Sequence, residues 1–325
     1  MSEETVVQAA ENVPLIWMDL DTGVDDTSAL SCAVSLEDRG LLNIAGVSAV
    51  CGNTTQEHAF QNTRNVLGML GRGDISVYPG AQKPLRDALR TAAHVHGENG
   101  LGGVSLTESL APEETEMAWD ALYRCAVENE GALELILTGP HTNAAIAFQK
   151  YPDLKNYLKR ILIMGGAEVG GNVTPAAEFN IWEDPEAAEI VFKSGVHVVM
   201  CGLDVTEKGL IRPDEIEKIE AGKTVGCRLF RDTTQHCRAW YESMGIPGLH
   251  IHDVNPLLYA VYPDLYTGEE AGVFVETRGY ITRGKTVSDR DTDVKFGVKN
   301  TTVVLDVDRD RFAELFMELL GETVE

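Results

Sequence analysis

The feature that most constrains the fold is an alternation of apolar runs with segments that carry apolar residues at helical spacing. The runs are continuously apolar, as in strands that are buried on both faces. Strands are predicted at 13–20, 42–50, 133–138, 161–164 and 196–201. Helices are predicted at 25–36, 56–70, 114–128, 143–148 and 186–194. This alternation predicts right-handed crossovers and a doubly wound, mostly parallel open α/β sheet of the Rossmann-like type.

The last part of the chain follows a different pattern. Residues 272–282 and 301–307 alternate apolar and polar side chains and are expected to form an antiparallel extension of the sheet. A closing helix is expected at 309–320. The chain contains no internal repeat and no linker rich in Pro and Ser. We therefore expect a single domain over residues 1–325, with 1–12 as a flexible N-terminal segment.

Charge and composition narrow the class of partner. Lys and Arg number 27 against 51 Asp and Glu, a formal net charge of -24, and no basic cluster is present. Such a surface disfavours nucleic acid and anionic membranes, so the expected partner is a small, neutral or cationic molecule. No apolar run reaches the ~20 residues of a membrane span. The acidic start lacks the features of a secretory signal, and the six cysteines are scattered, so we expect a cytoplasmic protein with buried free thiols.

Open α/β sheets bind ligands beyond the carboxyl ends of their strands, so the residues that follow each strand are the first candidates for chemistry. The first strand ends in four aspartates within eight residues: Asp19, Asp21, Asp25 and Asp26. One or two of them can cap the next helix, but four carboxylates in one turn repel one another unless a cation is present. A hard divalent ion with oxygen ligands relieves that repulsion.

Polar residues also follow the later strands. Gly52-Asn53 comes after the second strand, and Thr138-Gly139-Pro140 and Met164-Gly165-Gly166 follow two others. The 177–182 segment and the late His252-Asp253 pair add Glu, Asn and His. Each is weak alone, because Gly and Asn after a strand usually mark a turn. Together they place acidic, amide and imidazole groups at one rim with few Lys or Arg.

These motifs, in this order, resemble the inosine-uridine-preferring nucleoside hydrolase family. The resemblance rests on the Asp-x-Asp-x-Gly-x-Asp-Asp start at 19–26 and on His-Gly-x-x-Gly-Leu-Gly-Gly at 96–103. It also rests on Thr-Gly-Pro-x-Thr-Asn at 138–143, Gly-Asn-x-x-x-x-x-Glu-Phe-Asn at 171–180 and the final His-Asp pair. The matches run from residue 19 to residue 253.

The resemblance implies a calcium ion at the bottom of the pocket. Its protein ligands would be the carboxylates of Asp21, Asp26 and Asp253 and the backbone carbonyl of Thr138. Water and the ribose 2′- and 3′-hydroxyls would fill the other positions. Asp19 is expected to support the turn rather than to bind the metal.

The resemblance also implies the residues that hold the substrate, a ribonucleoside. Asp25 and Asn180 would bind the ribose hydroxyls, Asn172 and Glu178 the 5′-hydroxyl, and Asn53 the sugar or the attacking water. Met164 and Phe179 would form apolar walls, although ordinary core packing is the alternative for both. His96 would line the base side of the pocket, and Trp240 and Tyr241 would contact the base from a mobile segment.

Chemistry follows from these placements. Cleavage of an N-glycosidic bond develops positive charge on the ribose, which nearby carboxylates stabilise. Asp21 would accept the proton of the attacking water. His252, with an ordinary pKa near neutrality, would protonate the leaving base. The alternative for His252 is that it only orients Asp253, and the sequence does not separate the two.

Departures from the family pattern fall where base specificity would be set. His141 replaces a Leu, is expected at the surface and is assigned no role. The 240–248 segment and His250 also differ from the family pattern. The sequence therefore does not decide whether the preferred base is a purine or a pyrimidine. By resemblance we expect a homodimer or homotetramer.

Three rival functions remain. A non-catalytic nucleoside-binding protein could share the scaffold, but Asp21 and His252 are both present. A Mg²⁺ phosphatase of the haloacid dehalogenase type also starts with Asp-x-Asp, yet its later Lys and acidic motif are missing. The pairs His94/His96 and His250/His252 suggest zinc, but further ligands at suitable spacing are absent. No dinucleotide or Walker motif is present.

Overall fold

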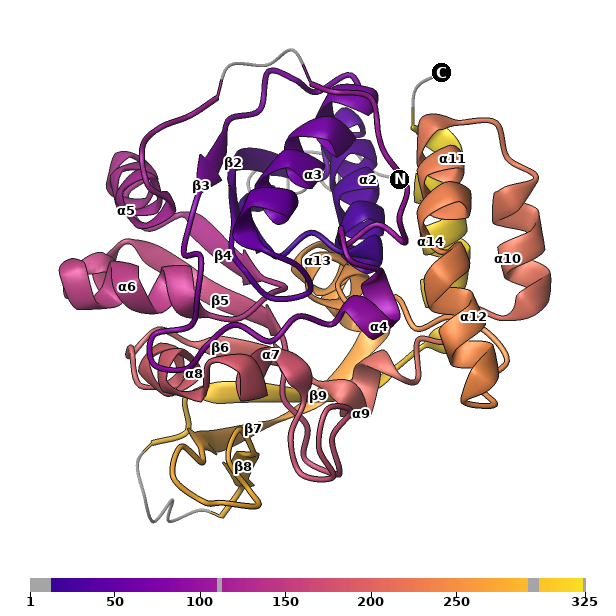
Figure 1. Ribbon diagram of the computed structural model, residues 1–325. Helices are drawn as coiled ribbons and strands as arrows, with labels where there is room; N and C mark the ends of the chain where they lie inside the picture. The colour runs from indigo at the N-terminus through magenta and orange to yellow at the C-terminus, as the bar shows by residue number, and fades with distance from the viewer. Residues whose placement is uncertain (1–12, 110–112, 292–297, 324–325) are drawn as a thin grey trace, which may run out of the picture.

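A computed structural model describes residues 13–109, 113–291 and 298–323 (Figure 1). The expected flexible segment 1–12 lies outside the described residues. A nine-stranded mixed sheet has the order β3-β2-β1-β4-β5-β6-β9-β7-β8. Its strands are β1 (Leu15–Leu20), β2 (Asn43–Ala49), β3 (Val77–Pro79), β4 (Leu133–Leu137), β5 (Leu158–Met164), β6 (Val198–Cys201), β7 (Tyr266–Val275), β8 (Thr286–Asp289) and β9 (Thr301–Val307).

Helices connect and cover the strands. They are α2 (Val24–Asp38), α3 (Gln56–Met69), α4 (Ala93–His96), α5 (Ala118–Glu128), α6 (Thr142–Lys150), α7 (Phe179–Glu183), α8 (Pro185–Phe192), α9 (Leu203–Thr206), α10 (Pro213–Glu220), α11 (Val225–Thr233), α12 (Gln235–Ser243), α13 (Val254–Val261) and α14 (Arg309–Glu322), with 3-10 turns η1 (Leu154–Asn156) and η2 (Pro263–Leu265). The mostly parallel α/β sheet predicted from the sequence is therefore confirmed.

The period-two geometry of strands divides the apolar side chains into two cores, one on each face of the sheet. On β1, Ile16, Met18 and Leu20 enter the core shared with α2, α11, α13 and α14, whereas Trp17 enters the core shared with α5, α6 and α8. Helix α2 lies between the sheet and the C-terminal helices (Figure 1), and residues 24–36 are buried on all its sides.

The sequence pattern misplaced several boundaries. Helix α5 begins at Ala118 rather than near 114, because the helical apolar period starts there. Strand β7 begins at Tyr266 and ends at Val275, since its partners are β9 and then β8, and residues 276–282 form turns. Strand β9 is antiparallel only to β7, because it also pairs in parallel with β6. Helices α9 to α13 were not predicted.

The strand order reverses at β1, which creates the crevice where open α/β sheets bind ligands. After β1 the chain adds β2 and β3 on one side, then crosses to β4, β5 and β6 on the other. All these neighbours are parallel, so their carboxyl ends lie at one edge. The turns after β1 and β4 therefore meet at the switch point.

Candidate active site

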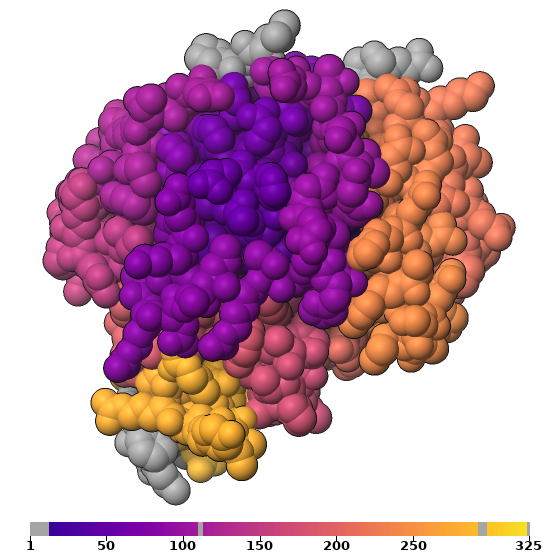
Figure 2. Space-filling model, in the orientation of Figure 1, coloured from indigo at the N-terminus to yellow at the C-terminus, as the bar shows by residue number. Residues whose placement is uncertain are grey.

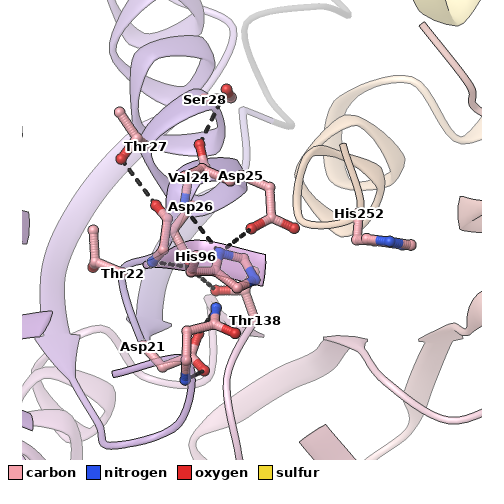
Figure 3. A network of polar contacts seen from close by, with 12 residues as sticks. Asp21, Thr22, Val24, Asp25, Asp26, Thr27, Ser28, His96, Thr138 and His252 are labelled. Atoms are coloured by element: carbon pink, nitrogen blue, oxygen red, sulfur yellow. Dashed lines mark hydrogen bonds and ion pairs between the residues drawn. The ribbon is translucent and has the colours of Figure 1, made fainter. Parts of the chain in front are cut away.

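The first site residues lie in the turn between β1 and α2. Asp21 follows β1, and Asp25 and Asp26 lie in the first turn of α2, where the free N–H groups and the helix dipole favour carboxylates. Asp26 Oδ2 accepts the Gly23 N–H at 2.8 Å, and Asp26 Oδ1 accepts the Thr138 hydroxyl at 2.6 Å. Asp26 thereby joins the ends of β1 and β4 (Figure 3).

Asp253 reaches the same place from far along the chain, as the residue before α13. Carboxylate oxygens of Asp25, Asp26 and Asp253 lie within 4.8 Å of one another, and all three residues are buried. Asp25 Oδ1 and Asp253 Oδ2 have no hydrogen-bond partner within the described part of the chain. The fold thus brings together three carboxylates with two unsatisfied buried oxygens.

Crowding and burial of these carboxylates disfavour their ionised forms. Burial, followed by repulsion from neighbouring carboxylates, raises the pKa of Asp21 and of Asp253 well above the ordinary value. Burial also raises the pKa of Asp25 to about 6 and raises that of Asp26. A divalent ion would restore the ionised forms. Because the donors are all oxygens and Asp253 Oδ2 lacks a partner among the described residues, the group fits a hard divalent cation, a class that includes Ca²⁺.

Asp21 lies beside this trio and is fixed by the turn after β2. Its Oδ2 accepts the Asn53 backbone N–H at 2.7 Å, and its Oδ1 accepts the Asn53 side-chain amide at 3.0 Å. Gly52 and Gly139 approach it so closely that an added Cβ would lie 2.1 Å from Asp21 Oδ2 or 2.8 Å from Asp21 Cβ. The two glycines make room for this carboxylate.

Asp19 connects β1 to neighbouring elements, and its expected role of supporting the turn stays a prediction. Its Oδ1 accepts the Ser48 hydroxyl at 2.5 Å and the Asn143 side-chain amide at 2.8 Å, which links β1 to β2 and α6. Burial raises its pKa to about 7. Asp19 does not line the cavity described next.

A cavity of about 570 Å³ opens at this edge of the sheet, a size typical of small-molecule sites. The sequence-predicted residues that line it are Asp25, Asn53, His96, Thr138, Met164, Asn172, Glu178, Phe179, Asn180, Trp240, Tyr241, His252 and Asp253. The other two, Asp21 and Asp26, are hydrogen-bonded to the lining residues Asn53 and Thr138. The structure therefore brings all the expected residues together.

One wall comes from the loop after β5 and from α7. Glu178 caps α7: its Oε1 accepts the Asn180 N–H at 2.9 Å, and its Oε2 accepts the Gly166 and Ile181 N–H groups at 2.9 and 3.2 Å. Burial raises the Glu178 pKa to about 7. The Asn180 amide donates to the Thr138 carbonyl at 2.7 Å, which connects this wall to the carboxylate cluster.

His96, from α4, faces the first turn of α2 (Figure 3). Its Nδ1 accepts the Val24 N–H at 3.3 Å, so the ring hydrogen is on Nε2. Burial lowers its pKa to about 4. The 3.9 Å approach of Nδ1 to Asp25 Oδ1 is therefore not an ion pair, because the ring is neutral.

His252 and Asp25 both line the cavity, and the His252 ring is directed away from the Asp25 carboxylate (Figure 3). Its Nδ1 is 2.8 Å from the Thr206 hydroxyl and its Nε2 is 3.2 Å from the Tyr241 hydroxyl. Burial lowers the pKa of His252 to about 3, which corrects the expectation of a pKa near neutrality. Trp240 and Tyr241 lie on helix α12.

The cavity is also lined by Ala92, His94, Val95, Gly171, Val173, Glu207, Met244, Ile246 and His250. Met244 and Ile246, within 240–248, and His250 lie in the region expected from the sequence to set base specificity. His94 was given no place in the pocket, but it precedes the predicted site residue His96 by two residues, a spacing that could have identified it. Among the described residues, no histidine belongs to a group able to hold a metal, so zinc gains no support. His141 was expected at the surface but is fully buried at the start of α6.

Comparison with known proteins agrees with this geometry. Residues 16–314 match the model of the inosine-uridine preferring nucleoside hydrolase family. The chain is 38% identical over 308 residues to a pyrimidine-specific ribonucleoside hydrolase of Citrobacter koseri, covering 94% of this chain and 97% of that one. A protein of the same description from Klebsiella pneumoniae is 39% identical, with 94% and 98% covered.

Solved structures give the same result. A plant nucleoside hydrolase superposes with a TM-score of 0.90 at 30% identity, covering 95% of this chain and 99% of that one. A purine-preferring ribonucleoside hydrolase from Gardnerella vaginalis gives a TM-score of 0.88 at 33% identity, covering 94% of this chain and 98% of that one.

The fold, the site and these matches define an enzyme of the N-glycosyl hydrolase class. The chain belongs to the inosine-uridine preferring nucleoside hydrolase family. No helix in its described residues has the length and apolarity to cross a membrane.

Proposed function

We propose that the protein hydrolyses the N-glycosidic bond of ribonucleosides to free base and ribose, in a reaction that requires Ca²⁺. The observation that carries this proposal is the buried group of carboxylates that opens into a cavity of about 570 Å³. The cavity lining includes no Lys or Arg among the described residues, which suits an uncharged ribonucleoside rather than a nucleotide.

The calcium ligands in this proposal are Asp21, Asp26, Asp253 and the Thr138 carbonyl. Burial and neighbouring carboxylates raise the pKa of all three carboxylates, and a bound cation would offset both effects by favouring the ionised forms, which supports this assignment. When bound, the ion supplies a Lewis acid that acidifies water and fixes vicinal hydroxyls. Asp25 has a buried oxygen without a partner and is proposed to accept a ribose hydroxyl together with Asn180.

Asp21 is the proposed base for the attacking water. Its two oxygens each accept one hydrogen bond from Asn53, which leaves one lone pair on each: one for the metal ion and one for a water proton. As the bond to the base breaks, positive charge develops on the ribose and the surrounding carboxylates stabilise it. Asn53 then holds Asp21 in place on the nucleophile side.

His252 is the proposed donor of a proton to the leaving base. Its position in the cavity wall and its contact with the Tyr241 hydroxyl support this role. Because burial keeps the free ring neutral, the role requires that His252 gains a proton when substrate is bound. If it does not, His252 serves only to orient Asp253.

A ribose-release assay tests the proposal. Inosine, adenosine, guanosine, uridine and cytidine are supplied separately, without phosphate, before and after chelation and Ca²⁺ add-back. Calcium-dependent release of ribose supports hydrolysis, and Asp21→Ala should abolish it. No ribose from any nucleoside would favour the rival reading, a nucleoside-binding protein without catalysis.

A second substrate separates the two roles of His252. His252→Ala should slow the release of natural bases strongly but spare a nitrophenyl riboside, whose leaving group needs no proton. Equal losses on both substrates would leave His252 a positioning role only. The same comparison on wild type sets the reference.

Base preference is left to the assay. The relatives are named pyrimidine-specific in two cases and purine-preferring in another. The walls that would face the base include Trp240, Met244 and Ile246 as apolar surface, with His94 and His250 as polar groups. The homodimeric or homotetrameric state and the cytoplasmic location remain predictions; all six cysteines are free and buried, which fits the latter.

A further inference from the structure

The C-terminal hairpin contacts the loop that forms one wall of the cavity. We define the loop as residues 165–172 and the hairpin as β7, β8 and the turn between them. In Figure 2 the yellow-orange atoms lie at the bottom of the molecule, below purple segments and beside rose-coloured ones. The hairpin brings residues from nearly the end of the chain to the loop after β5.

Lys285 makes the main contact. Its Nζ donates to the carbonyls of Ala167 and Glu168, each at 2.8 Å, and lies 3.5 Å from that of Gly170. A lysine ammonium has three N–H donors, and here all of them face carbonyls of one loop. The hairpin therefore fixes the carbonyl side of this loop.

Thr286 adds a second, buried contact. Its Oγ1 accepts the Ala167 N–H at 3.0 Å and lies 2.9 Å from the Ala167 carbonyl. At Gly166, which has φ +80°, an added Cβ would lie 2.9 Å from Thr286 Cγ2. The hairpin and the loop are thus in close packing contact as well as hydrogen-bonded.

Asp204 holds the other side of the loop. Its carboxylate accepts the Glu168 N–H at 2.7 Å and the Val169 N–H at 3.1 Å. Removing Lys285 would leave these bonds in place. We therefore expect the loop to shift in that variant rather than to unfold.

The loop leads directly to the residues proposed to hold the 5′-hydroxyl. The Gly166 N–H donates to Glu178 Oε2 at 2.9 Å, and Asn172 Oδ1 accepts the Phe179 N–H at 2.9 Å. Glu178 accepts three backbone N–H groups in all, so its Oε1 keeps one acceptor position. A shift of the loop would move both Asn172 and the Gly166 contact of Glu178.

We propose that Lys285 and Thr286 are positioning residues that set the subsite for the 5′-hydroxyl of the substrate by fixing the 165–172 loop. This inference rests on the proposed ribonucleoside hydrolase function. Neither residue lines the cavity, so each acts through Asn172 and Glu178. Their removal should affect only substrates that carry a 5′-hydroxyl.

The test compares a nucleoside with its 5′-deoxy analogue. For Lys285→Met we expect kcat/KM to fall about tenfold on the best nucleoside, the loss of a well-placed hydrogen bond, and less than about twofold on the analogue. Thr286→Val should likewise lose activity on the nucleoside and not on the analogue. Thr286→Ser, which keeps the hydroxyl, should have wild-type kinetics on both substrates. Lys218→Met is the control, because that lysine is exposed and, within the described part of the chain, pairs with Asp214 alone.

The outcomes separate this inference from the proposed function. Equal losses on both substrates, or a wild type that does not distinguish them, would overturn the positioning role while leaving hydrolysis intact. If the wild type releases no ribose from any nucleoside, the proposed function fails and this inference with it. Thermal unfolding of each variant identifies any variant that loses activity because it unfolds. In that case the kinetics of Thr286→Ser, which keeps the hydroxyl, decide whether the positioning role stands.

Discussion

Replacing Gly52 by Ala should disable the site without changing a single functional group. The new Cβ would lie 2.1 Å from Asp21 Oδ2 and 2.6 Å from Pro140 Cδ, against the 3.4 Å of ordinary contact. Either the new Cβ or Asp21 must therefore move by about 1.3 Å. The Cβ cannot move toward Pro140, which is itself too close, so Asp21 is expected to move. A displacement of that size at a catalytic group costs about 100-fold in rate, and overpacking costs about 1–3 kcal/mol of stability.

The assay is ribose release by Gly52→Ala, with the melting temperature measured alongside. The matched control is Gly321→Ala, because Gly321 lies in α14 with nothing within 4 Å of an added Cβ. That control should keep full activity and gain up to about 1 kcal/mol of helix stability. If Gly52→Ala keeps wild-type kcat while Asp21→Ala is inactive, then the position of Asp21 is not fixed by Gly52 and the reasoning is wrong.

Three further predictions concern the metal, pH and the core. Calcium at about one hundred times its Kd should raise the free energy of unfolding by about 2.7 kcal/mol, and Asp253→Asn should remove that gain, as calorimetry would show. Burial raises the pKa of Glu183 to about 7, so its stabilising contribution is complete below the unfolded value and is lost as pH rises through about 7. Glu183→Gln should therefore make the fall of the melting temperature between about pH 5 and pH 8 less steep, although Asp19, Asp25 and Glu178 also titrate there; an unchanged slope would contradict this. Phe316 is fully buried against Phe230, so Phe316→Ala should lose about 3–5 kcal/mol in denaturant unfolding with KM unchanged.

The strands of the parallel sheet could be predicted because each is a continuous apolar run. Strands β1 and β6, for example, are buried along almost their whole length. Because both faces of these strands are buried, each strand is an almost unbroken apolar run that stands out in the sequence. Helices α9 to α13 were not predicted, because short helices interrupted by loops give a weak periodic signal.

The bounds and pairing of the antiparallel strands β7, β8 and β9 depend on partner strands that the sequence does not reveal. Strand β7 pairs with β9 over its first part and with β8 over its last part. Its length follows from these two neighbours rather than from its own composition. For the same reason β9 has one parallel and one antiparallel partner.

The site shows the same division. The sequence alone indicated which residues are candidates for the chemistry, since the aspartates after β1, the amides and His252 stand in recognisable local motifs. Only the tertiary structure decided that Asp253 meets Asp25 and Asp26, that His141 is buried, and that burial lowers the pKa of His252. Local motifs depend on neighbours in the chain, whereas distances and desolvation depend on segments that the fold brings together. The sequence therefore determines the groups, and the packing sets their protonation and their contacts.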